Sequence, residues 1–368
     1  MDDSRMDDWI SVLLSCRRDH QAAVLVTVAS TRGSAPREPG TRMVVTAQHQ
    51  HGTIGGGHLE LQAIGIARDL LAAGSVAALR RFPLGASLGQ CCGGLVTLMF
   101  DAVSPSPSEA DWVDRVAHHY REGEACILVS ASGRTSASGA LVATANGCSG
   151  TLGGVSVDAA ACKLAVAMLA GEAQACLRAL EPGGALFLFA PVRRPDVEVV
   201  LFGAGHVGRA LVRILGELPC RVTWVDERVE LFPTGLAPGV RIEACDDPVA
   251  EVAAAPADAV FLVMTHSHPL DQALAEAILR RGDFRYFGLI GSMTKRRQFE
   301  RRLCARGVAS EALARMVCPI GISGIESKEP AAIAVAVAAQ LLPLLAEQPQ
   351  SAGRASGVRA ARQAGSAQ

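Results

Sequence analysis

The sequence lacks an excess of charge of either sign. Its 35 lysine and arginine residues nearly balance 36 aspartate and glutamate residues, which leaves a formal net charge of -1. A protein that binds nucleic acid or an anionic membrane through its overall charge would need a clear basic excess. We therefore expect neither nucleic acid nor a membrane among its partners.

Long hydrophobic runs are also missing. No uninterrupted apolar stretch reaches the roughly 20 residues that a transmembrane helix needs. The first ten residues are acidic and do not have the basic region and apolar core of a signal peptide. These two absences predict a cytoplasmic protein.

Cysteines at metal-binding spacing are absent as well. The eleven cysteines include no Cys-x-x-Cys pair, which argues against a structural zinc site and against a disulfide framework. Most of them, such as Cys162 and Cys176 on an alanine-rich helix, are expected to be small buried hydrophobic residues. Cys91 and Cys92 are the exception because glycines flank them. Accessible thiolates there are candidates to carry sulfur or to contact a soft metal such as molybdenum, and the alternative is a turn with two inert thiols.

Apolar residues make up 49% of the 368 residues, which is ample material for two or three globular domains. We predict an α/β protein with a duplicated N-terminal unit of α+β or α/β type, followed by a Rossmann-like, doubly wound parallel sheet. The predicted boundaries are 1–103 for the first unit, 109–195 for its degenerate copy, 196–347 for the Rossmann-like domain and 348–368 for a disordered tail.

The Rossmann prediction depends on residues 197–226. An apolar run is followed by Gly-Ala-Gly-His-Val-Gly, a helical pattern, a second apolar run and an acid, Asp226. Gly203 permits a tight turn, Gly205 lets the backbone approach a pyrophosphate, and Gly208 lets the helix pack closely on the sheet. Asp226 is placed to bind a ribose hydroxyl. His206 lies inside the turn and is a candidate for phosphate contact, and a turn that serves only as a scaffold is the alternative.

Later strands of the same domain end in polar loops. Because ligands of such sheets bind at the carboxyl ends of the strands, we expect these loops to border the site. His266 and His268 flank Ser267 after one strand and, on an extended segment, would project the same way and share a ligand. No third metal ligand is in sight. Residues 295–297 form a basic cluster that is expected to be an exposed helix face.

The first half contains a second candidate site. The segment 30–41 is rich in glycine and proline, so it predicts a loop that presents Arg32 and Arg37 to phosphate or carboxylate. Residues 55–57 are three consecutive glycines before His58 at a predicted helix start, an arrangement that favours anion binding. Solvated arginines are the alternative.

Residues 1–190 contain an internal repeat. The run 126–131 echoes 24–29, and the glycine turn 150–154 echoes 52–56 before an alanine-rich helix in both copies. The second copy has no counterpart of Cys91-Cys92 and replaces the arginine-rich loop by Ser-Gly-Arg-Thr-Ser-Ala-Ser-Gly. The first copy is therefore the better candidate for chemistry.

Several motifs from about residue 10 to 345 resemble those of the xanthine dehydrogenase accessory factors, the XdhC/CoxI family. The resemblance lies in LVTVASTRGSAPREPGTRMVV, GTIGGGHLE, QCCGG, VLFGAGHVGRAL, VMTHSHPLD, YFGLIGSMTKRRQFERRL and CPIGI followed by SKEPAAIAVAVAAQLL. The doubled cysteine, the weakly matched second copy and the C-terminal tail depart from the family pattern.

The resemblance implies an accessory protein and not a catalyst. It implies binding of molybdenum cofactor (molybdopterin), protection of the cofactor during sulfuration by a cysteine desulfurase, and delivery to apo-xanthine dehydrogenase or a related molybdenum hydroxylase. It also favours a homodimer, as does the apolar duplicated half. The residues themselves leave open a different class of function, an NAD(P)-dependent oxidoreductase with a nucleotide at the Rossmann turn.

Overall fold

The computed structural model of the chain describes residues 8–74, 77–84, 93–105, 112–132, 139–171, 174–193, 197–237 and 239–346. Cys91 and Cys92 lie outside these ranges. The chain divides into two compact units, with the division after residue 194. In the described ranges, every helix falls short of the length and apolar character that crossing a membrane requires.

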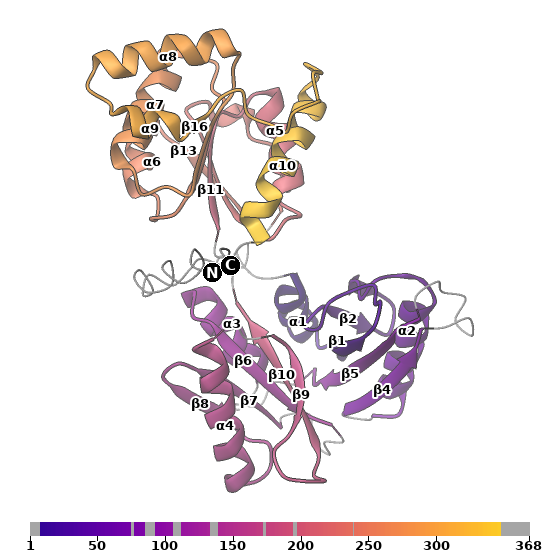
Figure 1. Ribbon diagram of the computed structural model, residues 1–368. Helices are drawn as coiled ribbons and strands as arrows, with labels where there is room; N and C mark the ends of the chain where they lie inside the picture. The colour runs from indigo at the N-terminus through magenta and orange to yellow at the C-terminus, as the bar shows by residue number, and fades with distance from the viewer. Residues whose placement is uncertain are drawn as a thin grey trace, which may run out of the picture. The chain divides into compact units, whose positions relative to one another are not determined.

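The first unit begins with helix α1 (Asp8–Arg18) and a five-stranded antiparallel sheet in the order β3-β2-β1-β5-β4 (Figure 1). The strands are β1 (Ala23–Arg32), β2 (Arg42–Thr46), β3 (Gln50–Gly52), β4 (Ala77–Pro83) and β5 (Leu95–Val103). Side chains alternate between the faces of a strand, so Val24 and Val26 of β1 face the same side. They pack there against Leu59 and Ala63 of helix α2 (Gly57–Ala72).

The second half of this unit repeats the arrangement. Its sheet has the order β8-β7-β6-β10-β9, which is the same order as in the first half. Its elements are α3 (Trp112–Glu122), β6 (Cys126–Ala131), β7 (Ala140–Thr144), β8 (Gly147–Gly150), α4 (Val155–Leu169), β9 (Cys176–Ala179) and β10 (Leu186–Val192). Helix α4 packs on its sheet as α2 does on the first. The duplication predicted from the repeated motifs is confirmed.

The two sheets pack against each other through the faces that α2 and α4 leave open. Ala29 and Met99 of the first sheet form a buried cluster with Leu188 and Ala190 of the second. Trp9 of α1 and Trp112 of α3 belong to a neighbouring buried cluster that also draws on both sheets. The first unit therefore has one continuous layer between its two copies.

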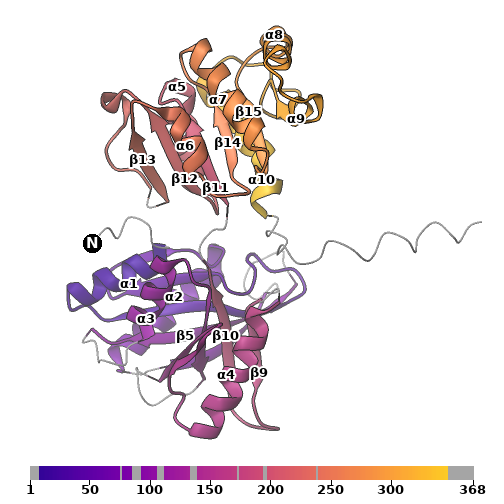
Figure 2. The same cartoon turned by 90° about the vertical axis from the view of Figure 1, so that its left-hand side faces the viewer.

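The second unit is a six-stranded parallel sheet in the order β13-β12-β11-β14-β15-β16, seen with its helices in Figure 2. The strands are β11 (Glu198–Phe202), β12 (Arg221–Asp226), β13 (Val240–Ala244), β14 (Val260–Val263), β15 (Tyr286–Leu289) and β16 (Met316–Val317). The helices are α5 (His206–Leu215), α6 (Pro248–Ala254), α7 (His268–Arg281), α8 (Met293–Ala305), α9 (Ser310–Ala314) and α10 (Pro330–Ala346). Counted from β11, the order is 3-2-1-4-5-6, the arrangement of dinucleotide-binding sheets.

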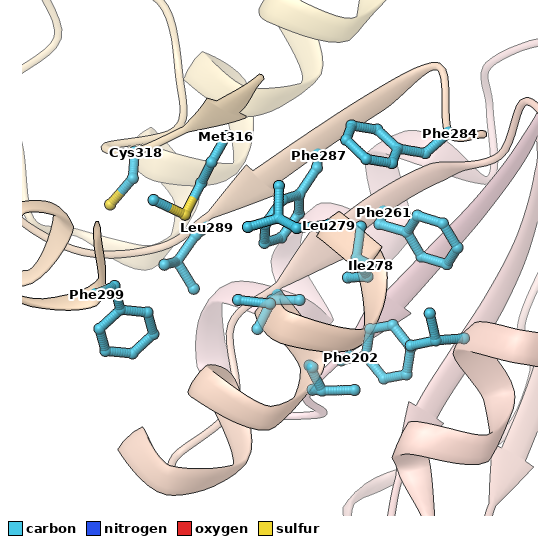
Figure 3. Close-up of a cluster of buried hydrophobic side chains, with 14 of the residues drawn as sticks. Phe202, Phe261, Ile278, Leu279, Phe284, Phe287, Leu289, Phe299, Met316 and Cys318 are labelled. Atoms are coloured by element: carbon cyan, nitrogen blue, oxygen red, sulfur yellow. The ribbon is translucent and has the colours of Figure 1, made fainter. Parts of the chain in front are cut away.

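Apolar clusters cover both faces of this sheet, as expected of a doubly wound fold. On one face, Phe202, Phe261 and Phe287 pack against Ile278 and Leu279 of α7 (Figure 3). On the other face, α5 and α10 cover a cluster centred on Trp224. Packing on both sides fixes the strand ends, and the loops that follow them are held at one edge.

The structure corrects one predicted element boundary. Residues 30–32 were expected in a loop, but β1 continues through Arg32, which pairs with Leu95 of β5 beyond an irregularity between Val28 and Ser30. The final helix, α10, begins at Pro330, since proline is favoured in the first helical turn. The hydroxyl of Ser327 accepts a hydrogen bond from the Glu329 backbone, outside the helix.

The expectation for the cysteines is partly wrong. Cys148 of β8 and Cys162 of α4 form a disulfide, with a Cα–Cα distance of 5.9 Å. Cys176 lies in β9 and not on a helix. Cys126 and Cys220 are buried small residues as expected, and burial raises the pKa of each thiol to about 12. Spacing in the sequence did not reveal the disulfide, because the packing of α4 on its sheet brings Cys148 and Cys162 together.

Candidate ligand-binding sites

The arginine loop of the first unit lies directly on its glycine turn. Gly55 has a φ of 122°, and a Cβ atom built on it would be 2.6 Å from Cβ of Pro36 and 3.4 Å from Cγ of Arg37. Only glycine fits this contact. The structure therefore places the exposed Arg37 beside the glycine turn.

Glu60 fills much of the predicted anion cradle. Its carboxylate accepts hydrogen bonds from the Thr53 hydroxyl at 2.5 Å, the Ile54 N–H at 2.9 Å and the Gly56 N–H at 3.1 Å. The carboxylate therefore already occupies the Gly56 N–H of this turn. Gly57 and His58, the first two residues of α2, are exposed, and no hydrogen bond from their N–H groups to a described residue is found.

In the second copy, too, a carboxylate on the helix binds the preceding glycine turn. Asp158 accepts from the Thr151 hydroxyl at 2.7 Å and from the Leu152 N–H at 2.6 Å. In both copies the acid follows the threonine by seven residues. This shared spacing in the repeated segments is the sequence signal that identifies the carboxylate.

His58 is exposed at the start of α2. Its Nε2 atom lies 3.1 Å from Nε2 of Gln62, one helical turn later. The imidazole therefore has a neutral polar neighbour, and it borders the exposed N–H groups of the first helical turn.

The arginine loop also touches the segment that follows the paired cysteines. A Cβ atom on Gly94 would be 2.1 Å from the backbone oxygen of Ser34 and 2.8 Å from that of Arg32. Gly93 and Gly94 come directly after Cys91 and Cys92 in the sequence, and the two cysteines lie outside the described residues. The loop 32–37 thus contacts both the glycine turn and the end of the Gln-Cys-Cys-Gly-Gly motif.

In the second unit, the three glycines of the Rossmann turn have different surroundings. Gly203 has a φ of 115°, and its Cβ would lie 2.4 Å from the Met264 oxygen. A Cβ on Gly208 would lie 2.1 Å from the Gly203 oxygen, whereas a Cβ on Gly205 would meet nothing within 4 Å. Gly203 and Gly208 are required for the fold. Gly205 and the exposed His206 at the start of α5 leave room for a ligand.

Asp226 is already engaged by the protein. Oδ2 accepts from the Ala204 N–H at 2.6 Å, and Arg228 binds both carboxylate oxygens at 2.9 Å. Burial acts to raise the pKa of Asp226, but the hydrogen bonds from Arg228 and Ala204 outweigh it and hold the pKa below its usual range. A ribose hydroxyl would have to compete with these partners.

The two histidines of the strand-end loop do not act as a pair on an extended segment. Ser267 is the N-cap of α7 and His268 is its first residue, so the chain has already turned into the helix. The Nε2 atom of His266 lies 3.9 Å from Oε1 of Glu227. Among the described residues, no group of three or more histidine, cysteine, aspartate or glutamate side chains is placed to hold a metal ion.

Lys295 is not part of an exposed basic face. Its Nζ atom donates to Asp271 at 2.6 Å and to the Ile290 oxygen at 2.9 Å, and the Asp271 side chain is fully buried. Asp271 also accepts from the N–H and the hydroxyl of Thr265. This network ties the loop after β14 to the start of α8. Arg297 remains exposed as expected.

A small hollow lies at this edge of the sheet. Its volume is about 10 Å³, enough for about one water molecule. Its lining includes Gly203, Asp226, Glu227, Thr265 and His266. Three of the predicted Rossmann-site residues, Gly203, Asp226 and His266, thus line this hollow, but it leaves little space for a base or a ribose.

We predict that Glu60→Gln destabilises the first unit by about 1.5–3 kcal/mol at pH 7, because charge-assisted hydrogen bonds to the turn are lost. Burial acts to raise the pKa of Glu60, but hydrogen bonds from Thr53 and the turn lower it overall. The stabilisation is therefore complete above the unfolded pKa of about 4.3 and is lost as the pH falls through the folded value. Urea unfolding against pH measures this.

The difference between wild type and Glu60→Gln should shrink as the pH falls below about 4, because the wild-type carboxyl then becomes neutral as well. Glu122→Gln, at an exposed position on α3, is the control and should change stability by less than about 0.5 kcal/mol. Equal stability of the two variants at pH 7 would contradict the role given to Glu60.

The Rossmann glycines should respond to alanine in opposite ways. Gly208→Ala should cost about 1–3 kcal/mol, since its Cβ collides with the Gly203 oxygen. Gly205→Ala should cost less than about 1 kcal/mol, because its Cβ points into open space at a helix N-cap. Thermal denaturation of both variants checks the order, and an equal loss at Gly205 would show that this position is closed.

Two family models match the chain. The XdhC and CoxI family model matches residues 16–83, and the XdhC Rossmann domain model matches residues 199–341. Among curated proteins, the chain is 29% identical over 161 residues to the uncharacterized protein YqeB of Escherichia coli (strain K12). That match covers 44% of this chain and 29% of YqeB, so the chain matches less than a third of that relative's length.

A solved structure of a protein from Bacillus halodurans, named a xanthine dehydrogenase, has the same fold. It aligns over 94% of this chain and 98% of its own, with a TM-score of 0.68 and 21% identity. Identity at that level shows the fold alone. The two family models fall one in each structural unit and together match more than half of the sequence. The chain therefore belongs to the XdhC and CoxI family and contains the XdhC Rossmann domain.

Proposed function

We propose that this protein binds molybdenum cofactor, protects it during sulfuration and delivers it to a xanthine dehydrogenase-type apo-enzyme. Membership of the XdhC and CoxI family supports the link to xanthine dehydrogenase. The single structural observation that carries the proposal is the position of the loop 32–37. It contacts both the glycine turn at Gly55 and Gly94, the end of the Gln-Cys-Cys-Gly-Gly motif.

The residues around this loop fit the chemistry of such a cargo. Molybdopterin carries a phosphate, and Arg37 with the exposed N–H groups of Gly57 and His58 offers charged and dipolar donors for it. The sulfurs of Cys91 and Cys92 would be soft donors suited to molybdenum or to a transferred sulfur atom. In this proposal the protein binds and shields its cargo, and it needs no catalytic residue of its own.

The partners follow from this role. Sulfuration requires a cysteine desulfurase as a source of sulfur, and delivery requires an apo-xanthine dehydrogenase or a related molybdenum hydroxylase. We also propose a homodimer in the cytoplasm. Each partner is a proposal based on the family.

A nicotinamide-dependent oxidoreductase is the alternative function. The strand order of the second unit and the open position of Gly205 favour a nucleotide at the Rossmann turn. The hydrogen bonds of Asp226 and the small hollow beside it weigh against the usual ribose contact. We therefore propose a nucleotide there only as a second ligand.

Calorimetry separates the two functions. We expect isolated molybdenum cofactor to bind to the intact protein, and we expect NAD and NADP to bind weakly or not at all, because Arg228 and Ala204 occupy Asp226. Each ligand is titrated into the same preparation. Tight binding of NAD without any response to molybdenum cofactor would overturn the proposed function in favour of the oxidoreductase.

The paired cysteines provide a second test. Changing Cys91 and Cys92 together to serine should reduce retained molybdenum and activation of apo-dehydrogenase on the order of tenfold, since a soft ligand is replaced by a hydroxyl. Both are changed because one sulfur could substitute for the other. Molybdenum bound after gel filtration and activity recovered per accessory protein are measured.

The matched control is Cys304→Ser, because Cys304 is an exposed free cysteine of α8 in the other unit. It should retain molybdenum and activate the enzyme like the wild type. If the folded double variant also retains molybdenum and activates the enzyme like the wild type, Cys91 and Cys92 do not contribute to cofactor binding. The phosphate and pterin contacts alone would then hold the cofactor.

A further inference from the structure

A cavity of about 450 Å³ lies between the two copies of the first unit. The first copy contributes residues of β1, β4 and β5, and the second contributes β9 and β10. The lining residues include Ser30, Thr31, Arg32, Arg81, Thr97 and Arg178. The volume is within the range of small-molecule sites, which is about 300–1,000 Å³.

Strand register places a row of polar side chains along the wall from the first copy. Thr97 of β5 is the direct partner of both Ser30 on β1 and Arg81 on β4. Cross-strand partners point to the same face of a sheet. Arg32 follows Ser30 by two residues in the same strand, so it points to that face as well. Two arginines and two hydroxyl side chains therefore share one wall.

The lining of this cavity is basic. Arg32 and Arg81 contribute positive charge from the first copy, Arg178 of β9 also borders the cavity, and no aspartate or glutamate is among its described lining residues. Within the described part of the chain, none of these three arginines forms an ion pair with a carboxylate. Like charges that share a cavity repel one another, and an anion bound between them would relieve this repulsion.

The charge is not a by-product of the duplication. The strand segments Leu79-Arg80-Arg81 and Leu177-Arg178-Ala179 correspond in the two copies, and Leu79 and Leu177 both pack in the layer between the sheets. At the next inward-facing position, the first copy has Arg81 and the second has Ala179. The first copy thus places a cation where packing alone requires only a small residue.

A second hollow adjoins the cavity. It has a volume of about 610 Å³ and shares Pro39 and Ala175 with the first. Its other lining residues include Thr41 and Gln174, which are neutral and polar, and one acid, Glu38, which disfavours a second anionic group there. A ligand whose anionic end lies at the arginines therefore has room for an uncharged organic part beside them.

We propose that this cavity is a binding site for a phosphate-bearing small molecule, with Arg32 and Arg81 on the wall from the first copy. The hydroxyls of Ser30 and Thr97 on the same wall supply further hydrogen bonds to phosphate oxygens. The proposal rests on the proposed function for the identity of the ligand in this cavity. The phosphate belongs either to molybdopterin or to a free nucleotide. It assigns to Arg81 a role that its position in an amphipathic strand did not indicate.

The test uses calorimetry of the full chain with inorganic pyrophosphate as the probe. We expect binding to the wild type, with Arg32→Gln and Arg81→Gln each weakening it about ten- to a hundredfold through loss of a charge-assisted contact. Arg80→Gln is the matched control. Arg80 is the neighbour of Arg81 on β4, pairs with Leu98 and lies on the opposite face of the strand. It should stay within about twofold of wild type, since it makes no contact in the cavity.

Thermal denaturation confirms that each variant is folded. Failure of the wild type to bind pyrophosphate at millimolar concentration would overturn the proposal, and so would equal affinities of Arg81→Gln and Arg80→Gln. Salt should weaken wild-type binding more than binding to Arg81→Gln, because fewer charges remain to be screened in the variant.

Retention of molybdenum cofactor by the same variants distinguishes the two sources of the phosphate. If Arg81→Gln loses both pyrophosphate and the cofactor, the cavity holds the cofactor phosphate. If it loses pyrophosphate alone, the cavity is a nucleotide-type site, and ADP should then bind the wild type and fail to bind the variant. Pyrophosphate binding that depends on Arg81 in a protein that never retains the cofactor would support this site and overturn the proposed function.

Discussion

Carboxylates of the chain itself hold the glycine-rich and strand-end loops of both units in place. Glu60 binds the glycine turn of the first unit, Asp226 binds the N–H of Ala204, and Asp271 binds Thr265. Backbone N–H groups that lack a partner in a protein interior are costly, and these acids satisfy them without a ligand. The loops are thereby ordered in advance, and arginines and the first turns of helices remain to attract an anion.

The sequence predicted most of the architecture because the relevant signals are local. Residues 199–226 specify one strand–helix–strand unit, because they contain an apolar run, a glycine turn, a helical pattern and an acid in that order. In the structure the two strands of this unit, β11 and β12, are parallel neighbours. The repeat of strand and glycine-turn motifs specified two copies of one sheet. The sequence also assigned the arginine loop and the glycine turn to one small unit, and in the structure Arg37 and Gly55 of these two segments lie side by side.

Contacts between distant segments were not predictable in this way. Lys295 was expected on an exposed helix face, but its partner Asp271 belongs to another helix. Cys148 and Cys162 pair across a strand and a helix. Arg81 is an ordinary arginine in an amphipathic strand until the second sheet packs opposite it. In each case the residue that determines the environment is distant in the sequence and is brought close by tertiary packing. Periodicity and motif spacing carry no information about such contacts.

Placing both copies of the repeat in one polypeptide has a consequence for molecular recognition. In a symmetric homodimer, any substitution at the interface appears twice, so a cationic wall would face an identical cationic wall. Here the two walls are encoded separately, and Arg81 in one copy corresponds to Ala179 in the other. Covalent fusion therefore lets one wall evolve to complement the charge of a ligand while the corresponding wall evolves for packing. The interface between the two copies can then accommodate a ligand that is not symmetric.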